Sequence, residues 1–221
     1  MPASLLEYRD VPVHVDRDLR SRGTITVRDG QIFVRVSTFC SDREVLRMLQ
    51  QKDRWIARKL ANPLMPVSFE IGKSTSMFLL GRRIGLQTEY ASRSRVEVHD
   101  TYMLIAGPSV KAMEKAFRDY AVEQLDLLID SFMSEIRPVS DFHLSYRYYT
   151  SRWGCCFKDR KDVMLNIWCI GLPLQGIKYV FCHELAHLKV ANHQKAFYQE
   201  LERIWPQYRL GLKITKSYII R

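Results

Sequence analysis

Residues 183–193 read HELAHLKVANH, and this stretch holds three of the six histidines in the chain of 221 residues. His183 and His187 are four residues apart, so on a helix they share one face with Cβ atoms roughly 5–6 Å apart. Two imidazoles in this arrangement can both reach one zinc ion at about 2.0–2.1 Å. Glu184 is rotated by about 100° from His183, where its carboxylate can contact a water on the metal without ligating the metal. The pattern therefore predicts a helix that carries a hydrolytic metal site.

A third ligand would leave one coordination position open for chemistry, and His193 is placed to supply it. A helix that continued through residue 193 would put His193 about 200° away from His183. The chain must therefore break between them, and we expect the break at Ala191 and Asn192, because asparagine tolerates left-handed backbone better than most residues. Asn192 is then expected as the N-cap of a further helix over 193–204.

Composition indicates a globular protein with enough apolar material for a sizeable core, at 47% hydrophobic and 11% aromatic residues. The longest apolar runs fall far short of the roughly 18–20 residues of a membrane span, and residues 1–20 lack the apolar core of a signal peptide. The five cysteines have no regular spacing, so no disulfide framework is predicted. These features together predict a cytoplasmic protein with no membrane partner.

The formal net charge of +10 favours anionic partners such as nucleic acid or nucleotides. The positive residues are spread along the chain, however, and solvated faces explain each group equally well. Association with nucleic acid is therefore left open as a partner prediction.

The order of predicted elements indicates an α+β protein. Asp29-Gly30 between alternating runs predicts a hairpin over 24–36, and further strands are expected over 64–107. Ser41 and Glu44 form a capping box that begins a helix over 42–61.

The second half is predicted to be richer in helix. Apolar residues recur at helical spacing over 110–136, short strands follow at 142–146 and 164–168, and the motif helix is expected over 174–190. Residues 151–156 look like a turn, and residues 207–221 like an apolar and basic tail. We therefore predict a β-rich N-terminal subdomain over 1–107 with one helix, and a helical metallohydrolase core over 108–221.

Five segments give the chain a resemblance to a known family. They are the hairpin near 24–36, KDRWIARKL at 52–60, SRWGCC at 151–156, YVFCHELAHL at 179–188 and NHQKAFY at 192–198. Together they resemble the YgjP-like predicted metal-dependent hydrolases, relatives of the SprT-like and WLM zinc peptidases. The resemblance implies a zincin-like core with His183, His187 and His193 as metal ligands and Glu184 as the catalytic acid/base. Cys155 stands where the family commonly has serine, and Tyr198 where it often has tryptophan.

The chemistry expected of such a site is hydrolysis assisted by one zinc ion, although other divalent metals would also suit it. Three neutral imidazoles leave the ion its full charge, which can lower the pKa of a bound water from 15.7 to about 7. Glu184 would take the proton of that water. Arg152 is a candidate for stabilising the oxyanion, or else packs the loop beneath the site. Cys155 and Cys156 are not expected as ligands, because a fourth protein ligand would close the catalytic position.

Three functions remain as hypotheses from sequence. The first is a zinc-dependent metallopeptidase acting on polypeptides. The second is a metal-dependent nucleoside triphosphate pyrophosphohydrolase, an activity proposed within the family, although the chain has no phosphate-binding loop of the GxxxxGK[ST] kind. The third is a nucleic-acid-associated module with a structural metal site, against which Glu184 argues because a structural site needs no general base.

Overall fold

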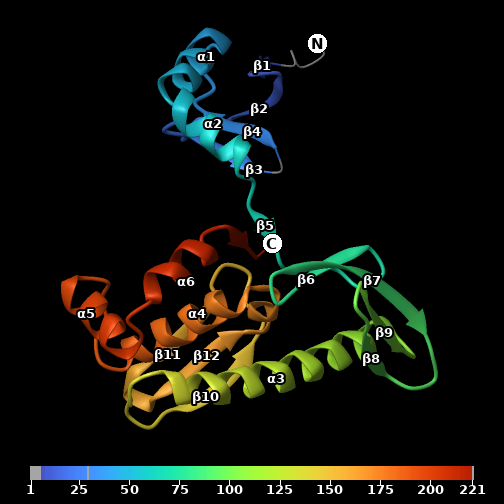
Figure 1. Cartoon of the computed structure of the whole chain (residues 1–221). Helices are drawn as coiled ribbons and strands as arrows, with labels where there is room; N and C mark the ends of the chain where they lie inside the picture. Colours follow the sequence, from blue (N-terminus) through green and yellow to red (C-terminus); the bar gives the residue numbers. More distant parts are fainter. Residues whose placement is uncertain (1–5, 29, 221) are drawn as a thin grey trace. The chain divides into compact units, whose positions relative to one another are not determined.

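The computed structural model describes residues 6–28 and 30–220, which divide into two compact units (Figure 1). The N-terminal unit is Met1–Leu64 and the C-terminal unit is Met65–Arg221. The subdomain boundary predicted at 107–108 falls inside the C-terminal unit, where a strand passes directly into a long helix. The change from strand-rich to helix-rich sequence near residue 108 therefore occurs inside the C-terminal unit and does not mark a boundary between units.

The N-terminal unit is a four-stranded sheet with two helices. Its strands are β1 (Leu6–Tyr8), β2 (Val11–Arg17), β3 (Thr24–Arg28) and β4 (Gln31–Val36), in the order β1-β2-β4-β3. The β2–β4 pair is parallel, and the other two pairs are antiparallel. The hairpin predicted over 24–36 is present as β3 and β4, with Gly30 at φ 69° in its turn, while Asp29 lies outside the described residues.

The helices of this unit cover one face of the sheet. Alternate strand residues pack against them, and the shared core consists of Val13, Ile32, Val34, Val36, Val45, Leu49 and Ile56. The capping box of Ser41 and Glu44 is present as predicted. The single helix predicted over 42–61 is instead two, α1 (Asp42–Gln51) and α2 (Asp53–Ala61), because the backbone leaves helical geometry at Lys52.

The C-terminal unit has two main sheets joined by one long helix. The first sheet contains β6 (Ser76–Leu79), β7 (Arg82–Tyr90), β9 (Tyr102–Gly107) and β8 (Arg95–Val98), in that order. The second contains β10 (His143–Arg147), β12 (Asp162–Asn166) and β11 (Gly154–Phe157). Helix α3 (Val110–Glu135) runs from β8 and β9 to β10 (Figure 1), and its buried side chains belong to one core that also includes residues of both sheets. This shared core explains why no boundary occurs at 107–108.

Three shorter helices complete this unit: α4 (Leu174–His187), α5 (Lys195–Ile204) and α6 (Tyr208–Thr215). Two 3-10 helices, Lys158–Arg160 and Ile167–Gly171, flank β12. The segment predicted as a tail is therefore wrong in part, because α6 packs closely on α4. Its Gly211 lies so near the Gln175 carbonyl and Tyr179 that a Cβ there would overlap both. The turn predicted over 151–156 is also partly wrong, since Gly154–Phe157 is the edge strand β11.

Two backbone contacts join distant segments of the C-terminal unit, and the first involves the 3-10 helix that precedes α4. The turn between β6 and β7 donates from Leu80 N to the Ile170 carbonyl (2.8 Å) and from Gly81 N to the Gly171 carbonyl (3.1 Å). The short strand β5 (Met65–Pro66) pairs with β13 (Tyr218–Ile219).

None of the helices in the described part of the chain combines the length and apolar character of a bilayer span.

Candidate metal centre

Helix α4 is the element that carries the motif, and ten of its fourteen residues are buried. Such burial is possible because α5, α6 and the second sheet pack around it. The helix ends at His187, and the following turn is tighter: Leu188 N donates to the Leu185 carbonyl (3.1 Å) and Lys189 N to the Ala186 carbonyl (3.2 Å), each three residues back. The motif helix is thus shorter than the predicted 174–190.

The turn after α4 brings His193 back toward the helix, as the predicted break requires. His193 lies in a bend just before α5, whose N-cap is Gln194. The prediction that Asn192 caps a helix starting at 193 is therefore wrong. The helix is broken from Leu188, three residues before the predicted Ala191, and His193 therefore reaches the other histidines from a bend and not from a helix.

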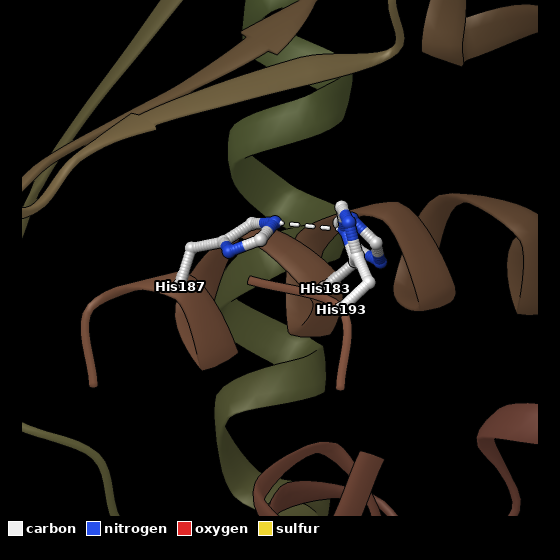
Figure 2. A group of neighbouring side chains, drawn as sticks. All are labelled: His183, His187 and His193. Atoms are coloured by element: carbon white, nitrogen blue, oxygen red, sulfur yellow. Dashed lines mark hydrogen bonds between the residues drawn. The ribbon is translucent and has the colours of Figure 1, made fainter. Parts of the chain in front are cut away.

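The structure brings the three predicted histidines together, with their rings pointing toward a common centre (Figure 2). Nε2 of His193 lies 3.1 Å from Nε2 of His187 and 3.0 Å from Nε2 of His183. Three nitrogens bound to one tetrahedral zinc ion at about 2.0–2.1 Å would be roughly 3.3 Å apart. The donor atoms therefore have the type and spacing of a three-histidine metal site.

The hydrogen bonds of the outer ring nitrogens support this reading. Nδ1 of His187 faces the Val190 carbonyl oxygen at 3.0 Å, so Nδ1 carries the hydrogen and Nε2 keeps its lone pair. A hydrogen on Nε2 of His193 can form a hydrogen bond with Nε2 of His183 or with Nε2 of His187, but not with both. A cation at the centre would satisfy all three nitrogens at once, so the residues fit a metal ion.

The protonation of the buried histidines also suits metal binding. Burial, with a smaller contribution from the neighbouring histidines, lowers the pKa of His183 to about 3. Burial likewise lowers the pKa of His187, against the opposing effect of its bond to Val190. Both imidazoles are consequently neutral near pH 7, the form that ligates metals.

Two aromatic side chains hold these rings in place. The hydroxyl of Tyr179 lies 3.2 Å from Nδ1 of His183, one helical turn away on α4. Phe197 of α5 is fully buried and contacts all three imidazoles, with ring centroids 4.6–4.9 Å from theirs. Neither residue is predicted as part of the site from the sequence, although the four-residue step from Tyr179 to His183 is visible there.

Glu184 is buried beside the histidines and packs against the backbone of β11. A Cβ placed on Gly154 would lie 2.7 Å from Cγ of Glu184 and 2.8 Å from its Oε1, so only glycine fits there. Burial raises the pKa of Glu184 to about 8, and the charge of Arg152 acts in the opposite direction. A divalent cation near the carboxylate would also favour its charged form. Gly154 is visible in the sequence only as part of the segment 151–156, and its contact with Glu184 is not predicted from there.

The loop before β11 is held by a fully buried asparagine. Asn166 donates from Nδ2 to the carbonyls of Tyr149 and Arg152, both at 2.8 Å, and its Oδ1 accepts from Trp168 N at 3.1 Å. This fixes the backbone at Arg152, whose side chain is exposed and whose guanidinium carbon is 5.7 Å from the centre of the Tyr149 ring. The positive charge of Arg152 acts to lower the pKa of Glu184, while its side chain remains accessible to solvent.

The two adjacent cysteines stay outside the histidine group. Cys155 and Cys156 lie on β11, and both are free and half-buried. Burial, and secondarily the charge of Glu184, raises the pKa of Cys156 to about 11, so its thiol is protonated near pH 7. Among the described residues, the group able to share one metal ion consists of His183, His187 and His193.

Comparison with known proteins places these features in a family. No curated protein matches the chain. One solved structure that it resembles is the crystal structure of the metallopeptidase zymogen of Pyrococcus abyssi abylysin, with 21% identity and a TM-score of 0.30 over 45% of this chain and 99% of that chain. A TM-score this low does not establish a shared fold. The model of the YgjP-like metallopeptidase domain, by contrast, matches residues 21–217, which include every residue of the histidine group and its supports. The chain belongs to the YgjP-like family, and its matching region is a metallopeptidase domain of that family.

Proposed function

We propose that the chain is a zinc-dependent peptidase whose active centre is formed by His183, His187, His193 and Glu184. The observation that carries the proposal is the convergence of three imidazoles beside the buried Glu184, with Nε2 of His193 at 3.1 Å from Nε2 of His187 and 3.0 Å from Nε2 of His183. A purely structural metal site would not need that carboxylate. Membership of a metallopeptidase family supports the same reaction class.

Glu184 and Arg152 would have different roles in peptide hydrolysis. When bound, zinc acts as a Lewis acid that lowers the pKa of water to about 7. The carboxylate of Glu184 accepts a proton from the attacking water and delivers it to the leaving nitrogen. The exposed guanidinium of Arg152 donates hydrogen bonds to the oxyanion that develops on the substrate carbonyl. Asn166 holds the backbone on which Arg152 depends.

The test compares Glu184→Gln with the wild-type protein after both are stripped of metal and reloaded with zinc. We expect unchanged zinc content and a loss of polypeptide cleavage of about 10²- to 10⁴-fold, the usual contribution of a general base. Glu202→Gln is the matched control, because Glu202 lies near the C-terminal end of α5 and makes an exposed ion pair with Arg209 of α6. Full activity in Glu184→Gln would contradict the assigned role.

Nucleoside triphosphates serve as the second substrate class in the same assay. Release of pyrophosphate that depends on Glu184, without cleavage of any unstructured polypeptide, would replace the peptidase proposal by the pyrophosphohydrolase. Turnover of neither class would leave the histidines as a structural site.

A further inference from the structure

The face of the N-terminal sheet that is turned away from α1 and α2 has an unusual composition. Residues on this face alternate with the buried core residues, and they are His14 and Asp16 of β2, Thr24, Thr26 and Arg28 of β3, and Phe33 and Arg35 of β4. We call them the open face. All but the half-buried Phe33 are exposed, and the helices of this unit pack on the other side.

Three of these side chains form one stack. The rings of His14 and Phe33 are parallel within 15° with centroids 4.7 Å apart, because the two residues are direct neighbours in the β2–β4 register. The guanidinium carbon of Arg28 lies 4.0 Å from the centre of the Phe33 ring. Planar and cationic groups arranged in this way are suited to stacking on nucleic-acid bases.

A hollow of about 630 Å³ adjoins the stack. Thr24, Thr26 and Phe33 line it. Three arginines and two carboxylates also line it, and they are Arg17, Arg28, Arg35, Asp16 and Asp42. Arg35 is paired with Asp16 at 2.9 Å, but a guanidinium has five N–H donors, so this pairing occupies only part of its capacity. Hydroxyl and guanidinium donors beside an aromatic ring suit a ligand that combines a flat ring with a phosphate.

The charge of this unit favours a polyanion. Residues 1–64 contain twelve Lys and Arg against eight Asp and Glu. The family match begins at residue 21, so β2, which supplies His14 and Asp16, lies outside it. The part of the open face on β3 and β4 lies within the matched region, and none of its residues belongs to the histidine group.

We propose that the open face binds single-stranded nucleic acid, with bases stacked on the His14–Phe33–Arg28 row and phosphates on the arginines. A single strand is favoured over a duplex because its bases are unstacked and accessible to aromatic side chains. The proposal is independent of the metal centre.

The test measures the fluorescence anisotropy of labelled oligo(dT) and oligo(U) as the full-length protein is added in a buffer that contains a metal chelator. The oligonucleotides have about twelve nucleotides, which is within the usual site size of proteins that bind single strands. We expect Phe33→Leu, which keeps the bulk but removes the ring, to weaken binding roughly 5- to 100-fold. Arg28→Gln should weaken binding and reduce the dependence of log K on log salt by about 0.7. Arg43→Gln is the matched control, since it removes the same charge from an exposed position on α1.

Four results would overturn the proposal. They are absence of binding at low salt, equal affinity for a duplex of the same length, equal effects of Arg28→Gln and Arg43→Gln, and competition by a mononucleotide as strong as that by the oligonucleotide. Should Phe33→Leu fail to fold, Thr26→Glu places a carboxylate in the hollow from an exposed strand position, and retention of full affinity by that variant would also refute the site.

Discussion

Gly154→Ala tests whether the backbone of β11 positions Glu184. The added Cβ would lie 2.7 Å from Cγ of the glutamate, whereas ordinary carbon contacts are about 3.5–4.0 Å, so one group must retreat by roughly 1 Å. Glu184 is buried and has little room to move. Overpacking of this kind costs about 1–3 kcal/mol. The backbone of Gly154 is not in the left-handed region, so the clash itself is the expected cause.

The assay is a double-mutant cycle in urea denaturation, combined with activity and zinc content. Gly154→Ala should destabilise the wild-type chain but have much less effect in the Glu184→Ala background, where the clashing atoms are gone. Peptidase activity should fall by about 10²-fold or more, because a displaced general base loses most of its contribution. Zinc content should persist, since the histidines keep their own supports. Equal destabilisation in both backgrounds, or full activity in the single variant, would refute the reasoning.

Three further outcomes are expected. Tyr179→Phe removes the hydroxyl beside Nδ1 of His183 and should weaken zinc affinity about 10- to 100-fold in a chelator competition, with the fold intact. Asn166→Ala leaves buried carbonyls without donors and should lower the free energy of unfolding by about 1–3 kcal/mol in urea titration. Hydrogen bonds from Arg9 and Tyr8 lower the pKa of Asp53 to about 2. The contribution of Asp53 to stability is therefore full above about pH 4 and is lost as the pH falls toward 2. Asp53→Asn should make the free energy of unfolding less dependent on pH in that range, as followed by circular dichroism.

The sequence predicted the centre better than its surroundings. Helical geometry alone placed His183 and His187 on one face and required a break before His193, and the structure has both features. The position of the break depended on how tightly the chain turns after His187. That turn is stabilised by a hydrogen bond between the imidazole of His187 and the Val190 carbonyl. Local helix propensity does not predict such a bond between a side chain and the backbone.

Contacts between distant segments account for what was missed. Nothing local to Gly154 reveals that Glu184, thirty positions later, occupies the space where a side chain would be. The domain boundary was also out of reach, because only the packed structure shows that Met113 and Phe117 of α3 share a core with Met103 and Ile105 of β9.

The pairing of β5 with β13 has a consequence for how the C-terminal unit could be re-engineered. Met65 N donates to the Ser217 carbonyl at 2.9 Å, and Val67 N donates to the Ile219 carbonyl at 3.0 Å, so the first and last strands of the unit are neighbours. Proteins whose chain ends are adjacent commonly accept circular permutation. A short linker from 220 to 65, with new ends opened in the exposed turn at 92–94, would retain the buried Ile220 and would separate the metal centre from the N-terminal unit.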